Sequence, residues 1–204
     1  MAITLVIQPD STAGVDTMML TDTPDTNYGT SVNIKSGEET VTVNTIRSLV
    51  KFDLSPIPAV ATITSCTLAL VVSEDRSSNT RVKHVYRQKR AWTELGATWN
   101  KYDGTNNWQT AGGFGANDCE QTDIGATSFG SADPIGTIHS FSLTASAIQE
   151  MVRGTFTNNG FLLKTDTESD DSYGYNSSDY ATAADRPKLT VVYTIPEANS
   201  GWWM

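Results

Sequence analysis

Four aromatic side chains in one long polar stretch could bind a sugar: Trp92, Trp99, Tyr102 and Trp108. A flat ring covers the apolar face of a pyranose while polar neighbours fix its hydroxyl groups. We expect the first two to pack beneath the loop, whereas Trp108, flanked by asparagine and glutamine, should be less covered. Trp108 and Tyr102 are therefore the predicted sugar-binding rings, and Tyr173 and Tyr175 are lesser candidates of the same kind.

Basic residues concentrate in one short segment. Five of the 14 Lys and Arg side chains lie within ten positions: Arg81, Lys83, Arg87, Lys89 and Arg90. Alternation along a strand puts Arg81, Lys83 and Arg87 on one face, where charge-assisted contacts could hold the carboxylates of an anionic polysaccharide. The alternative is a solvated edge strand whose charges prevent pairing with another sheet.

Acidic residues collect in a stretch from 166 to 185 that holds no Lys or Arg: Asp166, Glu168, Asp170, Asp171, Asp179 and Asp185. Carboxylate oxygens at this density suit Ca²⁺, and Asp166, Glu168 and Asp170 are the predicted ligands. An EF-hand loop is excluded, because Asp171 stands where that loop needs glycine and Ser177 where it needs glutamate. The alternative is a hydrated loop, or a partner for the basic strand of a neighbouring copy. A second oxygen-rich loop holds Asp22, Asp25 and Asn27.

Catalytic motifs are poorly represented. Neither His84 nor His139 lies near a Gly-x-Ser-x-Gly elbow or in a His-Glu-x-x-His pair, so spacing predicts no nucleophile–base or zinc arrangement. We expect both histidines to be structural. A glycosidase-type carboxylate pair stays open, since such a pair is defined by distance in space. The sequence favours a protein that is not an enzyme.

The elements that would position these residues are short strands. The chain has 29 Thr and 19 Ser but only 11 Leu, which favours extended segments over helices. Alternating apolar residues predict strands at 3–7, 15–20, 32–35, 48–54, 63–72, 82–86, 138–143, 161–164 and 189–193. A helix is predicted over 145–153, capped by Thr144 and stopped by Gly154. This pattern indicates an all-β protein, a single jelly-roll β-sandwich over residues 1–195 with one short helix.

Charge and hydropathy exclude two classes of function. The 204 residues carry a net charge of −9, and such a chain repels phosphate backbones, so we expect no nucleic-acid partner. No apolar run approaches the ~20 residues that cross a bilayer, so we expect no membrane insertion. Cys66 is in phase with Leu68 and Leu70 and should be a buried structural thiol, whereas Cys119 lies in a polar loop.

Several blocks follow one another in a recognisable order. They are Pro24-Asp25-Thr26-Asn27-Tyr28-Gly29, residues 47–58, Trp92-Thr93-Glu94 with Thr98-Trp99-Asn100, Ser177-Ser178-Asp179, and residues 186–193. Over residues 16–194 they resemble DNRLRE-type domains, which overlap the family-96 carbohydrate-binding modules. The resemblance implies a non-catalytic jelly-roll β-sandwich displayed outside cells, some of whose relatives bind polysaccharides that include acidic ones such as alginate.

The end of the chain suggests an anchor. Residues 196–204 should form a tail, yet it ends in Trp202-Trp203-Met204, and large apolar groups at a free end normally bury against something. They either fold back on the domain or dock on another chain, and we predict them as a partner anchor.

These observations together predict a surface adhesion or structural module. Because the sequence opens on Met1 without a basic or long apolar leader, we expect a bacteriophage virion component, a capsid decoration or tail-associated protein on the particle surface. Its expected partners are other virion proteins or copies of itself, and a polysaccharide. The alternatives are a free or exported bacterial carbohydrate-binding module, extracellular or on the cell surface, and a polysaccharide lyase or glycosidase.

Overall fold

The computed structural model describes residues 1–10, 12, 14–39, 44–130, 133–169 and 171–197. Its strands are β1 (Ala2–Ile7), β2 (Val15–Leu20), β3 (Asn33–Glu39), β4 (Asn44–Lys51), β5 (Thr62–Asp75), β6 (Arg81–Arg87), β7 (Gly125–Phe129), β8 (Ile138–Leu143), β9 (Phe161–Thr165), β10 (Ser172–Asn176) and β11 (Lys188–Thr194). The α-helix is α1 (Ala145–Arg153), and a short 3₁₀ turn, η1, spans Ala183–Asp185. The protein is therefore mostly β with one short helix, as its composition predicts.

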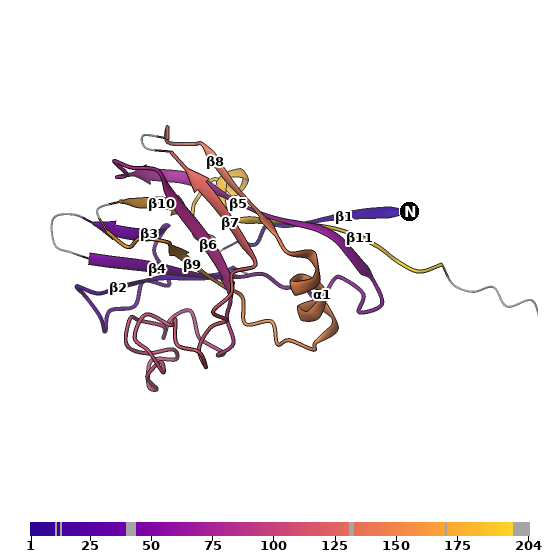
Figure 1. The fold of residues 1–204 in the computed structure, drawn as a ribbon, viewed down its shortest axis with the longest axis horizontal. Helices are drawn as coiled ribbons and strands as arrows, with labels where there is room; N and C mark the ends of the chain where they lie inside the picture. Colours follow the sequence, from indigo (N-terminus) through magenta and orange to yellow (C-terminus); the bar gives the residue numbers. More distant parts are fainter. Residues whose placement is uncertain (11, 13, 40–43, 131–132, 170, 198–204) are drawn as a thin grey trace, which may run out of the picture.

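The strands form one antiparallel sheet that curls around an interior (Figure 1). Its order is β1-β11-β5-β10-β3-β4-β9-β6-β7, with β2 paired to β4 and β8 paired to β5. The long strand β5 pairs with β11 along its first part and with β10 at its end. At the far edge β7 returns toward β8, where the Thr127 hydroxyl donates to the Ser140 carbonyl at 3.1 Å.

The main core fills the inside of the curled sheet. Alternation decides which side chains face it: Leu68, Leu70 and Val72 of β5 lie inside, opposite Leu189 and Val191 of β11. Inward side chains of other strands join them, among them Ile34, Val85, Phe141, Phe161, Tyr173 and Tyr175. This core fixes which face of each strand is turned to solvent.

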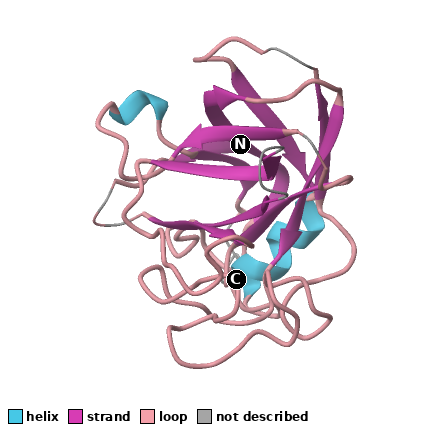
Figure 2. Cartoon of the chain, turned by 90° about the vertical axis from the view of Figure 1, so that its left-hand side faces the viewer, coloured by secondary structure: helices cyan, strands magenta, loops and turns pink. Residues whose placement is uncertain are grey.

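Helix α1 covers one end of the core, which Figure 2 shows beside the strands. Its buried face presents Ile148 and Met151 to the core. Gly154 ends the helix with φ 75°, a left-handed conformation that glycine adopts without strain. The predicted helix and its boundaries are confirmed, but the Thr144 side chain makes no capping hydrogen bond. Within the described residues, no helix is long and apolar enough to cross a bilayer.

A second apolar cluster lies outside the curl, between the sheet and the long segment 88–124. The sheet contributes Met19, Leu49, Tyr86 and Leu162, and the segment contributes Trp92, Ala97, Trp108 and Cys119. Cys119 lies in this long segment between β6 and β7, as expected, and its side chain is fully buried in the cluster. Cys66 is buried as expected, and both thiols are free. Burial raises the pKa of Cys66 to about 12, which leaves it unreactive at neutral pH.

Two strands escaped prediction. Strand β7 reads as a polar Gly-Ala-Thr-Ser run, and β10 reads as a Gly- and Ser-rich loop. In β10 the aromatic residues Tyr173 and Tyr175 alternate with Gly174, and burial on the inside of the sheet compensates for the low strand propensity of glycine. Strand β4 also begins and ends earlier than expected, at Asn44 and Lys51 rather than 48 and 54.

Candidate functional site

The basic residues of β6 point into the protein. Lys83 is 1 % exposed, and its Nζ donates to the Ser36 carbonyl at 2.9 Å and to the Ser36 and Thr165 hydroxyls, each at 3.2 Å. Burial lowers its pKa to about 7. The next inward residue, Val85, belongs to the main core. The prediction of a solvent-facing basic strand is therefore wrong for Lys83.

The two arginines of the same face are held by carboxylates. Arg81 Nη2 lies 2.7 Å from Asp171, and Arg87 lies 2.8 Å from Glu120 and 2.7 Å from Glu150. These ion pairs engage Nη2 of Arg81 and both Nε and Nη1 of Arg87. Neither Arg81 nor Arg87 offers an exposed cation to a polysaccharide, which corrects the predicted binding face.

The acidic residues Asp166 and Glu168 also make their contacts within the protein. Glu168 accepts two hydrogen bonds from Arg47, at 2.7 and 2.8 Å, and Asp166 accepts the Thr167 amide at 2.7 Å. Asp170 lies outside the described residues. No three His, Cys, Asp or Glu side chains in the described part of the chain form a metal-holding group. The arrangement of Asp166 and Glu168 thus differs from the predicted calcium site, and calcium binding there stays a prediction.

Asp171, next in this stretch, anchors a turn. Its carboxylate accepts hydrogen bonds from the backbone of Ser78 and Asn79, the latter at 2.9 Å. Burial raises its pKa, but these hydrogen bonds and the charge of Arg81 lower it by more, so the net shift is downward. The residue is therefore a structural carboxylate that ties the β5–β6 turn to β10.

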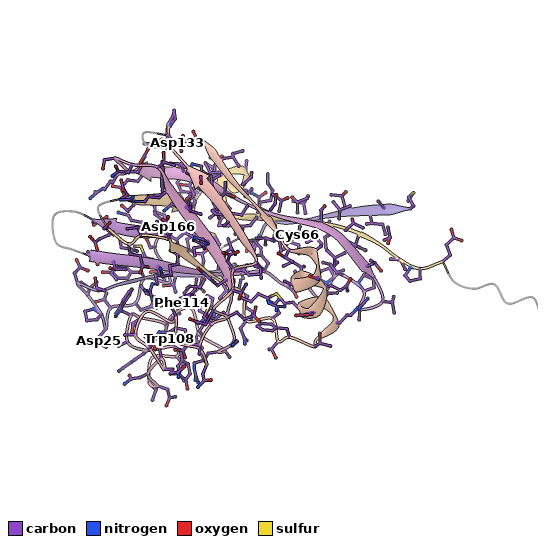
Figure 3. All side chains as sticks on the ribbon, viewed as in Figure 1. Asp25, Cys66, Trp108, Phe114, Asp133 and Asp166 are labelled. Atoms are coloured by element: carbon purple, nitrogen blue, oxygen red, sulfur yellow. The ribbon has the colours of Figure 1, made fainter. Side chains whose placement is uncertain are left out.

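The aromatic loop is packed more tightly than its sequence suggests. Trp108 is only 5 % exposed, and its Nε1 donates to the Thr98 carbonyl at 2.9 Å. Tyr102 meets its ring edge-on at 5.7 Å, and the Arg90 guanidinium lies 4.8 Å from the Tyr102 ring. Trp99 is half-buried under Arg47. The expectation that Trp108 is the freer tryptophan is therefore wrong. Figure 3 shows it beside Phe114, at the loop end of the molecule.

Tyr173 and Tyr175, the lesser candidates for sugar-binding rings, belong to a buried network of aromatic and polar side chains. Tyr173 and Tyr175 are each 1 % exposed, so neither presents a ring face to solvent. His139 lies 3.0 Å from the Tyr175 hydroxyl and 3.1 Å from Asp133, and Phe129 stacks on its ring at 3.6 Å. The expectation that His139 is satisfied within the fold is consistent with these contacts.

Three carboxyl groups meet near the start of β2. Asp16 is 3 % exposed and accepts the Ser178 amide at 2.8 Å, while Glu94 accepts the Asp16 amide at 3.1 Å. Burial, together with the charges of Glu94 and Asp179, raises the pKa of Asp16 to about 7. Burial raises the pKa of Glu94 and of Asp179 as well. Sequence reasoning missed this group because its members come from three distant segments.

One cavity combines polar and aromatic groups on the outer face of the sheet; we name it the outer-face pocket. It has a volume of about 260 Å³ and is lined by Asn33, Val71, Val72, Ser73, Ile135, Gly136, Asn176, Tyr180 and Asp185. Strands β3, β10 and β5 form its floor, and the turns around Ile135 and Tyr180 form its walls.

Pairing of the strands explains why these polar groups converge. Asn33 of β3 is the register partner of Asn176 of β10. Asn33 precedes the core residue Ile34, and Asn176 follows the core residue Tyr175, so both asparagine side chains face outward. Between β10 and β5 the register shifts, so that Ser73 has no partner residue on β10. Such bulges are frequent beside functional sites because they redirect a side chain.

Two polar atoms of this pocket have no partner. Asn33 Oδ1 and Ser73 Oγ are buried and make no hydrogen bond with the described residues. Gly174 leaves the room for Ser73, since a Cβ at that position would lie 3.1 Å from Ser73 Oγ. A larger cavity of about 440 Å³ near α1 is lined by residues such as Leu54, Ile57 and Met151, and it contains none of the unpartnered atoms found in the described chain. The outer-face pocket is therefore the better candidate site.

No motif signals this pocket in the sequence. Its polar residues are common types separated by long stretches, and only the pairing of three strands brings them together. The pairing of Tyr175 with Val72 depends on β10, which the sequence did not reveal.

Residues 16–191 match the model of a family described as the disaggregatase related repeat domain, which is β-rich. No curated protein gives a significant match. The DNRLRE-type and family-96 assignment is not confirmed by this match, although the matched range nearly coincides with the range of that resemblance. Because the match covers most of its length, the chain belongs to the disaggregatase related repeat domain family.

Proposed function

We propose that this protein is a non-catalytic carbohydrate-binding module and that the outer-face pocket holds one sugar residue. The observation that carries the proposal is the pair of unpartnered polar atoms, Asn33 Oδ1 and Ser73 Oγ, at a pocket walled by Tyr180. Buried polar atoms are nearly always hydrogen-bonded, so unpartnered ones at a cavity favour a ligand that supplies the missing bonds. Sugar hydroxyl groups donate and accept, and so can satisfy both atoms.

The walls of the pocket suit the rest of a pyranose. Tyr180 is half-buried, and Val71 and Ile135 add apolar surface, while Asn176 and Asp185 add further polar groups. Carbohydrate sites combine an apolar surface for the ring with polar groups for its hydroxyls. We further infer that the curled sheet is a jelly-roll β-sandwich, in which β5 is shared by the strand groups on its two sides.

The size of the pocket sets the expected affinity. A volume of about 260 Å³ equals that of roughly nine water molecules, which is the order of a single sugar ring. A ligand of about twelve non-hydrogen atoms at ~0.3 kcal/mol each binds with roughly 4 kcal/mol, or a Kd of about 1 mM. We therefore expect weak binding of monosaccharides, strengthened when several copies engage one polymer.

Replacing Ser73 with alanine should separate binding from stability. Methyl glycosides of glucose, galactose and mannose serve as probes in isothermal titration calorimetry. For a glycoside that binds the wild-type protein, the loss of one hydrogen bond should weaken its affinity by about threefold to tenfold. The free energy of unfolding should stay the same or rise by up to about 1 kcal/mol, because an unpartnered hydroxyl is removed.

Ser48→Ala is the matched control. Ser48 is fully buried in β4, and its hydroxyl donates to the Lys35 carbonyl, so its removal should lower stability and leave sugar affinity unchanged. Equal sugar affinity in wild type and Ser73→Ala would contradict the proposed role of the pocket, and so would the absence of binding to any probe.

Where the protein occurs is a separate proposal. A bacteriophage particle, with the chain on its surface, is the setting we favour, and an extracellular bacterial module is the alternative. The anchor predicted at Trp202, Trp203 and Met204 lies outside the described residues. Detection of the chain by mass spectrometry in purified particles would support the virion setting, and its presence only in cell-free medium or on cells would contradict it.

A further inference from the structure

We propose that the outer-face pocket selects sugar residues without a carboxylate, such as neutral hexoses, and rejects uronic acids. This inference rests on the proposed function and adds the class of ligand. It departs from the expectation of an acidic polysaccharide, which depended on the basic residues of β6. Those residues lie on the inner face of the sheet, and the pocket lies on the outer face.

The charge of the lining supports this selectivity. Among the described residues that line the pocket, Asp185 is the one acidic residue, and none of the others is basic. A carboxylate accepts two hydrogen bonds from adjacent hydroxyl groups, which suits a neutral sugar. A uronate would place a second negative charge in the same small volume, where like charges repel.

Two cations, Lys35 and Arg186, stand within two positions of a lining residue in the sequence. Lys35, two positions after Asn33 on β3, lies 2.7 Å from Glu74 and 2.9 Å from Glu39. Arg186, next to Asp185, donates from Nε to the Tyr180 carbonyl at 2.7 Å. Neither residue lines the pocket. A ligand carboxylate would therefore meet Asp185 without a compensating cation from the lining.

The experiment compares ligands that differ only at C6. Methyl glycosides of glucose, galactose and mannose are each paired with the corresponding uronate, and ligand-observed NMR gives the affinities for wild type, Asp185→Asn and Asp22→Asn. In wild type at least one neutral glycoside should bind about tenfold or more tightly than its uronate. Asp185→Asn should reduce this ratio to about threefold or less.

Asp22→Asn is the matched control, because Asp22 is exposed, lies outside the pocket and loses the same charge. It should keep the wild-type ratio. A second readout needs no variant: raising the salt from about 0.02 M to about 0.5 M should improve uronate binding and leave neutral binding unchanged.

The outcomes distinguish the two proposals. If a uronate binds as tightly as its neutral partner in wild type, or if its binding weakens with salt, the selectivity is wrong and the proposed function stands. An unchanged ratio in folded Asp185→Asn would also overturn the selectivity. If none of the glycosides binds, the proposed function itself fails.

Discussion

Asp16→Asn is expected to raise the free energy of unfolding at pH 8 by about 4 kcal/mol and to leave it nearly unchanged at pH 4. In the folded protein, burial and the charges of Glu94 and Asp179 raise the pKa of Asp16 to about 7. Between its ordinary pKa and 7 the folded state binds more protons than the unfolded state, so stability falls as the pH rises through this window. Asparagine removes the buried charge and keeps an oxygen that can accept the Ser178 amide.

Urea unfolding of both proteins across pH 4 to 8 measures the effect. Asp16→Asn should gain stability relative to wild type as the pH rises from 4 to about 7 and keep that gain at pH 8, because only wild type must ionise this buried carboxyl group. Asp22→Asn removes one negative charge at an exposed site and should leave the wild-type slope unchanged. Parallel curves for wild type and Asp16→Asn would contradict the assignment of Asp16 as a buried acid with a raised pKa.

Trp108→Ala should lower the free energy of unfolding by about 3–5 kcal/mol, the usual cost of removing a buried Trp. The ring is 5 % exposed, packs with Met19 and Leu162 against the outside of the sheet, and donates to the Thr98 carbonyl. Its loss leaves both a cavity and an unpaired carbonyl. Urea unfolding gives the change in stability.

The same variant separates packing from sugar binding. At a temperature where Trp108→Ala remains folded, its affinity for neutral glycosides should equal that of wild type, because Trp108 does not line the outer-face pocket. Tyr102→Ala should behave similarly, with a smaller loss of stability, since Tyr102 is only half-buried. If Trp108→Ala kept wild-type stability but no longer bound sugar, the result would contradict this packing role and indicate that Trp108 contacts the sugar.

Sequence periodicity predicted the elements with strong apolar alternation. Strands such as β1 and β11, and helix α1 with its boundary at Gly154, follow from local pattern and capping. Strand β10 did not, because Tyr173-Gly174-Tyr175 resembles a loop until its two rings are seen inside the core. Local sequence carries little information on glycine-containing strands whose stability comes from long-range pairing.

The direction of a strand face was harder to predict than the strand itself. Alternation correctly places Arg81, Lys83 and Arg87 on one face of β6, but charged residues normally face water. The inner face is possible here because Ser36 and Thr165 accept hydrogen bonds from Lys83, and three carboxylates on other segments pair with the two arginines. No pattern within β6 reveals those partners, so the site inferred from the basic run was misplaced.

The burial of Trp108 has a related cause. Its polar neighbours suggested an exposed ring, yet the segment 88–124 folds back on the outside of the sheet and covers Met19, Leu49 and Tyr86. An outward-facing apolar patch on the strands requires such a cover. The sequence shows both the apolar strand residues and the aromatic loop, but it does not show which faces which.

The most direct test of the outer-face pocket is an amide NMR titration of the wild-type protein with the neutral methyl glycosides. The proposed function predicts that the shifting resonances centre on Asn33, Ser73, Asn176 and Tyr180, around the unpartnered atoms of the pocket. Shifts centred instead on the segment 88–124, or no shifts at sugar concentrations well above the expected Kd of about 1 mM, would contradict it.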